Sequence, residues 1–268
     1  LFGPFTPDQV SAGSQPDWYI GFLDGALRMM PNWESSFWGI TISWNIMIPA
    51  MIMPGILFTG LALYPFIESW VTGDKREHNI LDRPRNAPVR TGIGMMAITF
   101  YCLLWVGGAN DIIATAFDLS INAITWFLRV MIFVLPPIVF VVTKRVCLGL
   151  QRRDRDKLLH GYESGRVLRL PHGEFIEVHQ PLSVKDLAVI TAKTDILPLP
   201  APEKSDVDGV RNKKYRLESW RHKLSKAFYG DNVARPTDAE IEAGQQHAAH
   251  SAAIEAPLNE YEDADQIR

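Results

Sequence analysis

The residues best suited to chemistry lie near the N-terminus, where Pro16 precedes Asp17, Trp18 and Tyr19. A carboxylate in such a setting can act as a general base when a proton donor binds within hydrogen-bonding distance. The Tyr19 hydroxyl can orient that donor, or a water molecule that carries the proton. A long uncharged stretch begins at Ser35, so this carboxylate would lie at the edge of a membrane, where it could act as a proton acceptor.

The same carboxylate could instead have a purely structural role. Ser14 is a good helix N-cap, Pro16 suits a first helical turn, and Asp17 lies three residues after Ser14, as in a capping box. Such a cap contributes about 1 kcal/mol to helix stability. From the spacing alone the cap is the favoured interpretation, and it predicts a short helix that runs to about Met30, before Pro31.

A second carboxylate, Asp24, lies seven residues after Asp17 and would share nearly the same face of this helix. It could be a second proton station or the (i, i+4) ion-pair partner of Arg28, and the ion pair is the favoured interpretation. Four apolar residues would form one stripe at helical spacing: Ile20, Leu23, Leu27 and Met30. We therefore expect this helix to lie along a membrane surface.

Three later stretches are long and apolar enough to cross the roughly 30 Å hydrocarbon core of a membrane. The first two contain no charged residue, and the third contains only one. Transmembrane helices are predicted at about residues 40–66, 91–110 and 120–143. The predicted fold class is an all-α membrane protein: an outer amphipathic surface helix, three transmembrane helices and a mixed cytoplasmic C-terminal extension.

Two features depart from a plain apolar span. Pro49 and Pro54 should kink or locally unwind the first transmembrane helix. Arg129 would lie roughly 13 Å along the third helix at 1.5 Å per residue, and a charge at that depth is a candidate functional group that needs a partner. Asp111, Asp118 or a group on another subunit could pair with it, and structural pairing is favoured over proton transfer.

The distribution of charge indicates the orientation, although the net charge of −3 is uninformative because a basic stretch and an acidic tail offset one another. The segments that follow the first and third spans are rich in Lys and Arg and should be cytoplasmic. The N-terminal end should lie outside. The expected divisions are residues 1–34 (outer loop and surface helix), 35–147 (membrane domain), 148–197 (cytoplasmic extension), 198–236 (linker and basic amphipathic helix) and 237–268 (acidic, disordered tail).

The run of residues 16–31 closely resembles the Pro-Glu-Trp-Tyr motif of cytochrome b, the quinol-oxidising subunit of cytochrome bc complexes, and the helix that follows that motif. Seven of the sixteen positions coincide without a gap: Pro16, Trp18, Tyr19, Phe22, Leu27, Arg28 and Pro31. Asp17 replaces the commoner Glu, which resembles the actinobacterial branch, whose complexes oxidise menaquinol. The resemblance covers about residues 1–180, the C-terminal half of cytochrome b, and is lost in the tail.

The resemblance implies an outer quinol-oxidation site in a bacterial cell membrane, with Asp17 and Tyr19 as catalytic residues. It also implies four quinol-binding residues: Pro16, Trp18, Ile20 and Phe22. The seven histidines all lie outside the predicted spans, so this chain is not expected to ligate a transmembrane haem or another metal. The b haems would belong to an N-terminal part of cytochrome b.

The partners implied by the resemblance are that haem-bearing part, a Rieske iron–sulfur protein, a cytochrome c subunit and, in a supercomplex, cytochrome oxidase. Membrane lipid is a further partner, and the sequence has no signature of nucleic-acid binding. Two alternatives stay open. One is a non-catalytic membrane scaffold in which Asp17 is only a cap, and the other is half of a transporter with a site at Arg129 and the broken first helix.

Overall fold

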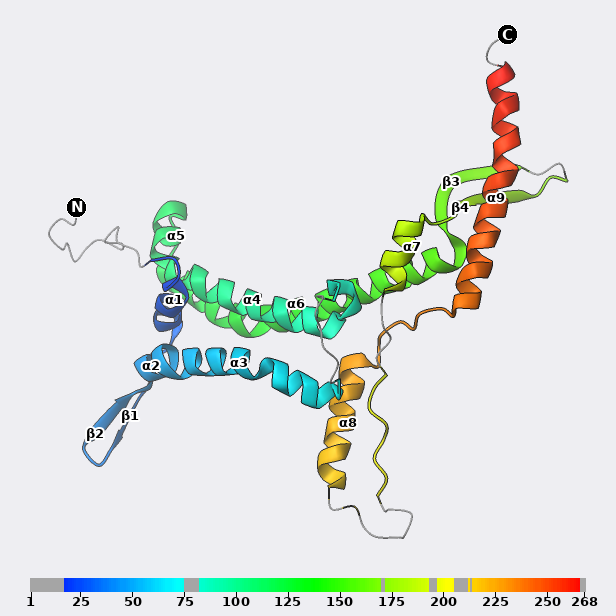
Figure 1. The fold of residues 1–268 in the computed structure, drawn as a ribbon. Coiled ribbons are helices and arrows are strands. Elements are labelled where there is room, and N and C mark those ends of the chain that lie inside the picture. The colour runs from blue at the N-terminus through cyan, green and yellow to red at the C-terminus, as the bar shows by residue number, and fades with distance from the viewer. Residues whose placement is uncertain are drawn as a thin grey trace. The chain divides into compact units, whose positions relative to one another are not determined.

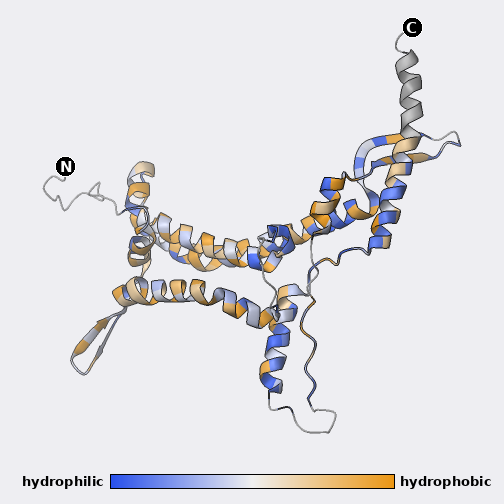
Figure 2. Ribbon diagram, viewed as in Figure 1, coloured by the Kyte–Doolittle hydropathy of each residue, from blue (hydrophilic) through white to orange (hydrophobic). Residues whose placement is uncertain are grey.

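The computed structural model describes residues 17–74, 82–169, 172–192, 197–204, 212 and 214–265, the last twelve of these by their backbone only (Figure 1). These residues form two compact units. The first unit contains residues 17–74 and 89–144, and the second contains residues 82–88 and those from 145 onward. Three helical segments are long and apolar enough to cross a membrane, which confirms the predicted number: Trp44–Thr72, Pro88–Gly108 and Ile121–His160 (Figure 2).

The first span starts with a short helix and a wide turn. Helix α2 (Trp44–Met47) leads into a π-helical segment, η1 (Ile48–Ile52), and then into α3 (Met53–Thr72). Proline has no amide hydrogen to donate, so Pro49 and Pro54 remove two bonds of a regular α-helix, and the backbone widens where they are missing. The local unwinding that the two prolines predicted is therefore confirmed.

A hairpin stands in front of this span, where the sequence predicted only the start of the membrane domain. Strands β1 (Glu34–Phe37) and β2 (Ile40–Ser43) pair antiparallel, with Phe37 opposite Ile40. Trp38 and Gly39 form the two-residue loop and both have positive φ, at 50° and 77°. Two-residue hairpin loops of this kind match the twist of the strands. The prediction missed the hairpin because its strands contain almost no charge.

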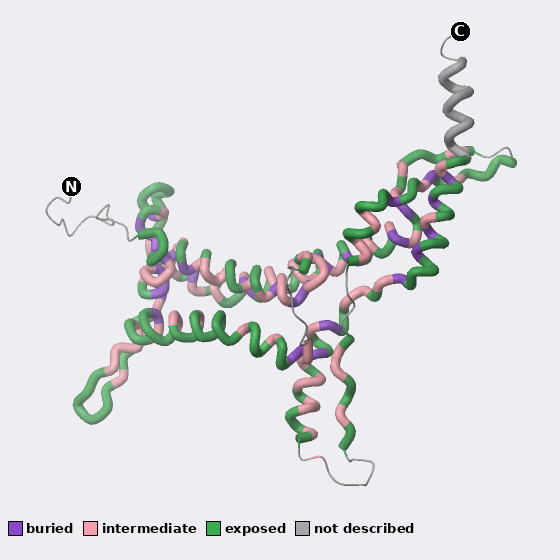
Figure 3. Tube along the Cα trace, viewed as in Figure 1, coloured by how far each residue is buried: buried purple, intermediate pink, exposed green. Residues whose placement is uncertain are grey.

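The remaining elements of the first unit are α1 (Gly21–Met29), α4 (Pro88–Gly108), α5 (Asn110–Phe117) and the first half of α6 (Ile121–His160). Their core is a small apolar cluster made of Ala26, Met29, Leu104 and Leu128, with Phe22, Met53 and Ile124 among the residues packed against it. The long helices otherwise expose large apolar side chains (Figure 3), as is expected where lipid or another chain covers them.

Helix α6 continues without a break to His160, well past the predicted end of the third span near residue 143. It ends at Gly161, whose φ of 82° is the left-handed conformation that favours glycine after a helix. Strands β3 (Tyr162–Arg169) and β4 (Phe175–Gln180) then pair antiparallel, with Tyr162 opposite Gln180. The C-terminal extension therefore mixes helices with strands. Its cytoplasmic location stays a prediction.

Helices α7 (Val184–Thr191), α8 (Tyr215–Tyr229) and α9 (Asp238–Asp265) complete the second unit. The basic helix predicted at 198–236 corresponds to α8, where the apolar Trp220 remains 56% exposed. The core of the unit is formed by Leu158, Leu182 and Ile241.

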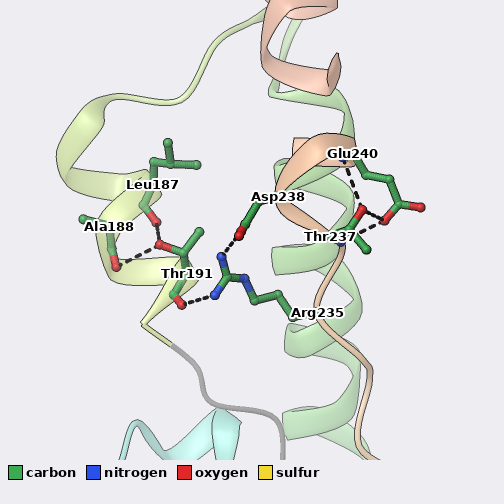
Figure 4. A network of polar contacts seen from close by, with 7 residues as sticks. All are labelled: Leu187, Ala188, Thr191, Arg235, Thr237, Asp238 and Glu240. Atoms are coloured by element: carbon green, nitrogen blue, oxygen red, sulfur yellow. Dashed lines mark hydrogen bonds and ion pairs between the residues drawn. The ribbon is translucent and has the colours of Figure 1, made fainter. Parts of the chain in front are cut away.

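The acidic tail, for which the sequence predicted disorder, contains helix α9. Thr237 and Glu240 form a capping box at its start, in which the Glu240 carboxylate accepts from the Thr237 amide at 2.8 Å (Figure 4). A Cβ on Gly244 would overlap the Leu159 carbonyl, and Ala248 is fully buried. Small residues at helical spacing thus give α9 a packing face that a count of its charges overlooks.

Candidate functional site

Helix α1 is held against α4 by glycines that let the two backbones touch. A Cβ on Gly25 would overlap the carbonyl oxygen of Leu104, and a Cβ on Gly108 would lie 2.6 Å from the carbonyl oxygen of Gly21. Side chains larger than hydrogen therefore cannot occupy this crossing without moving α1. Gly21 lies only two residues after Tyr19. This crossing therefore sets the position of Asp17, Trp18 and Tyr19.

A charged network fixes the same helix near its C-terminal end. The Arg28 guanidinium donates to Asp111 Oδ1 at 2.8 Å and to Asn110 Oδ1 at 3.0 Å, and its Nε lies 2.8 Å from Asp24 Oδ2. The Asp111 side chain is only 9% exposed. Desolvation lowers the pKa of Arg28, but the two carboxylates outweigh this effect and raise the pKa above its ordinary value.

Arg129 has different partners from those that the sequence predicted. Its Nε donates to the Met29 carbonyl at 2.6 Å and its Nη2 to the Met30 carbonyl at 3.5 Å, while the guanidinium carbon lies 5.0 Å from the centre of the Trp126 ring. The last carbonyls of a helix lack intrahelical partners and carry partial negative charge. Arg129 therefore caps α1, and Asp111 is instead a partner of Arg28.

The motif itself forms a turn rather than the start of a helix. The Ile20 amide bonds the Asp17 carbonyl at 2.9 Å, and α1 begins only at Gly21 without a side-chain cap. The helix predicted to begin near Pro16 therefore begins later, and Asp24 does not share a helix face with Asp17. Asp24 is ion-paired to Arg28.

The side chains of this turn are exposed and contact one another. The Tyr19 hydroxyl donates to Asp17 Oδ2 at 2.8 Å, and the Trp18 and Tyr19 rings meet edge to face at 6.0 Å. The Trp105 indole donates to the Trp18 carbonyl at 3.0 Å, which ties the turn to α4. Trp18 is 74% exposed, so the turn offers an aromatic wall with a carboxylate on it.

The other residues expected to line a quinol pocket differ in their surroundings. Ile20 is 41% exposed beside the turn. Phe22 packs against the core cluster, with its ring 5.1 Å from that of Tyr101. Pro16 and the proposed cap Ser14 lie outside the described residues. Among the residues that are described, no group of three or more His, Cys, Asp or Glu side chains is placed to hold a metal.

Sequence reasoning missed the residues that position this turn. The spacing of Gly21 and Gly25 is the small-residue pattern known from helix crossings in membranes, and it could have indicated the crossing. The pairing of Arg28 with Asp111 spans 83 positions, and no local pattern reports a contact of that range.

The chain resembles the C-terminal part of curated bacterial proteins, although no family model matches it. It is 53% identical to the cytochrome b subunit of the cytochrome bc1 complex of Streptomyces coelicolor over 250 residues, which are 91% of this chain and 46% of that protein. The corresponding subunit of Mycobacterium bovis is 52% identical over 184 residues, 69% of this chain and 33% of that protein. The corresponding subunit of Corynebacterium diphtheriae is 50% identical over 184 residues, with 69% and 34% covered.

The chain therefore spans less than half the length of the curated relatives that it matches. A match over 91% of the chain also extends well past residue 180, so the similarity reaches further into the C-terminal segments than the sequence analysis expected. The chain is a homologue of the C-terminal part of the cytochrome b subunit of bacterial cytochrome bc1 complexes.

Proposed function

We propose that this chain forms one wall of the outer quinol-oxidation site of a cytochrome bc1-type complex in a bacterial cell membrane, with its N-terminal end outside and its C-terminal end in the cytoplasm. The observation that carries the proposal is the exposed Asp17 carboxylate, held beside Trp18 and Tyr19 on a turn that is anchored to α4. The relatives are cytochrome b subunits of the cytochrome bc1 complex, which supports a role in electron transfer.

In this proposal Asp17 accepts a proton from the quinol, either directly or through one water molecule. The Tyr19 hydroxyl donates to one carboxylate oxygen and leaves the other oxygen available as an acceptor. Trp18 supplies an exposed aromatic face for the quinol ring, while Ile20 and Phe22, with Pro16, complete the apolar wall. The glycine crossing, the Arg28 network and the Arg129 cap position this wall.

Asp24 and Arg28 act as an anchor in this account and not as a proton relay. Asp24 and Asp111 both bind the Arg28 guanidinium, which joins α1 to α5. A relay would need a group that can gain and lose a proton, whereas the raised pKa of Arg28 keeps that guanidinium charged.

The proposal assigns the remaining redox chemistry to other parts of the assembly. Electrons from the quinol, which we take to be menaquinol, pass to a Rieske iron–sulfur protein and to b haems on the N-terminal part of cytochrome b. The electron taken up by the Rieske protein would pass to a cytochrome c subunit and, in a supercomplex, to cytochrome oxidase. The residues of this chain bind the quinol, orient it and take up a proton.

The test is turnover by the intact complex that carries Asp17→Asn, a change that keeps the shape of the side chain but removes its charge. We expect quinol oxidation to slow by about 10²- to 10⁴-fold, the usual contribution of a general base, with normal b-haem spectra. The matched control is Glu34→Gln, another exposed carboxylate of the same unit, which should leave turnover unchanged. Normal turnover with Asp17→Asn would remove this residue from the mechanism and favour the scaffold alternative.

A further inference from the structure

The hairpin of β1 and β2 carries an apolar tip that nothing in the described residues covers. Trp38 is fully exposed, Phe37 is 64% exposed and Ile40 is 69% exposed. These three residues meet at the loop, because Phe37 pairs directly with Ile40 around Trp38 and Gly39. So much apolar surface at the end of a short hairpin is costly in water and favourable where something apolar receives it.

The loop conformation adds a second cost. Trp38 has a φ of 50°, a region that bulky residues rarely adopt and that Asn, Asp or Gly would occupy with less strain. A Cβ on Gly39 would meet nothing within 4 Å, so that glycine serves the turn and not a tight contact. Trp38 is thus a poor choice both for the turn and for contact with water. Contact of its indole with an apolar environment outside the described residues would offset both costs.

The hairpin is amphipathic across its two faces. Directly paired residues share a face, and successive residues alternate, so Phe37, Ile40 and Ile42 lie on one face together with Ser35 at the base. The opposite face holds Glu34, Ser43 and the pair Ser36 and Thr41, whose hydroxyls are 3.1 Å apart. Residues 35–43 contain no charge. This division into an apolar and a polar face is that of a segment at a boundary between lipid and water.

Hydrogen bonds hold the base of the hairpin against the start of the first span. The Trp44 indole donates to Ser35 Oγ at 3.0 Å, and the Asn45 amide donates to the Trp33 carbonyl at 3.2 Å. Ser43 leads directly into α2 without a linker. In Figure 1 the hairpin extends from the α2 end of this segment, away from α1.

We propose that the hairpin is a membrane anchor, whose tip of Phe37, Trp38 and Ile40 inserts into the interfacial layer of the bilayer beside the N-terminal end of the first span. Direct continuity with a membrane span, an uncharged tip and the preference of Trp for the lipid–water interface favour lipid as the occupant. The proposal goes beyond the quinol site and does not depend on Asp17.

The experiment measures spin-label accessibility in the purified native assembly, reconstituted in phosphatidylcholine–phosphatidylglycerol nanodiscs. Cys102 and Cys147 are first replaced by Ala, and single labels are attached through Trp38→Cys, Phe37→Cys and Ser36→Cys. Oxygen concentrates in lipid and a neutral nickel chelate in water, so the ratio of their collision rates reports the surroundings of each label. Phe37→Cys keeps the test valid if the loop does not tolerate a change at Trp38.

We expect the ratio of oxygen to nickel collisions to be several-fold higher at positions 37 and 38 than at 36, the control on the polar face. Frequent nickel collisions at both tip positions would show that the tip lies in water and overturn the proposal. Low rates for both reagents would show that the tip is buried against protein, which would overturn it equally. Quinol turnover by the labelled variants with an intact site should be unchanged, so this test can fail without the quinol proposal failing.

Discussion

The contacts inside the first unit differ in kind from those inside the second unit. In the first unit the helices meet through glycines and a small apolar cluster, and most of the long-range polar bonds gather around α1. In the second unit, side-chain amides join segments that are distant in sequence: Gln151 donates to the Arg85 carbonyl at 2.6 Å and accepts from the Val233 amide at 2.9 Å. Gln245 likewise donates to the Leu158 carbonyl at 3.0 Å.

This difference shows where each unit requires a defined geometry. Polar contacts inside a membrane domain are expensive unless they are satisfied, so their concentration around α1 marks a place in the first unit where direction-specific bonds fix the geometry. In the second unit such bonds are spread over several segments and accompany a small apolar core. In the first unit the polar bonds therefore position one site, whereas in the second unit they hold the whole fold together.

The largest effect is expected from Gly25→Ala, because the added methyl group would overlap the Leu104 carbonyl. Overpacking of this kind costs about 1–3 kcal/mol, and here it would also displace the turn that carries Asp17. We expect lower thermal stability of the complex and weaker binding of quinol-site inhibitors. Gly55→Ala is the matched control, since a Cβ there meets nothing within 4 Å. Equal behaviour of the two variants would contradict the glycine crossing.

Asp111→Asn should have the next largest effect. The change leaves Arg28 with Asp24 as its remaining carboxylate partner among those described here, and losing a hydrogen bond to a charged group costs about 1.5–3 kcal/mol. Asp24→Asn removes only an (i, i+4) pair, typically worth about 0.3–0.5 kcal/mol. Thermal unfolding of the two variants measures the difference. A larger loss for Asp24→Asn would mean that the anchor of α1 lies elsewhere.

In the second unit, Gln151→Leu should loosen two segments together. It removes the bonds that join Gln151 to the Arg85 carbonyl and to the Val233 amide, and one such hydrogen bond contributes about 0.5–1.5 kcal/mol. Hydrogen exchange should accelerate at Val233 and nearby amides, while amides of α1 keep their protection. If exchange were unchanged at Val233, the Gln151 side chain would not hold these segments of the second unit together.

The smallest effect concerns the pH dependence of α9. Bonds from the Thr237 amide and hydroxyl lower the pKa of Glu240 below its ordinary value of 4.5. A lowered folded-state pKa means that the stabilisation is present above pH 4.5 and is lost as the pH falls through the folded-state value. Amide exchange at the start of α9, corrected for intrinsic rates, should therefore rise in acid. Glu240→Gln should remove most of this dependence, and an unaltered profile would refute the capping box as its source.

Much of the membrane domain could be predicted from the sequence because hydropathy and proline act locally. The three spans and the broken first helix follow from composition and from the missing amide hydrogens at Pro49 and Pro54. The position of the amphipathic helix along a membrane surface stays a prediction.

The contacts that position the candidate site were harder to predict because they join residues far apart in the sequence. The partners of Arg129 lie 99 and 100 positions away and are backbone carbonyls, which no sequence pattern identifies. The start of α1 at Gly21 is set by packing on α4 rather than by an N-cap residue. The hairpin of β1 and β2 was not predicted because uncharged strands resemble the beginning of a membrane span.

The most direct test of the account is a high-resolution map of the intact complex with a quinol analogue bound in its outer site. The account predicts that an Asp17 carboxylate oxygen lies within about 2.6–3.2 Å of a ring oxygen of the analogue, or reaches it through one ordered water molecule. A carboxylate turned away from the bound analogue, and bonded only to groups of its own chain, would contradict the assignment of Asp17 as proton acceptor.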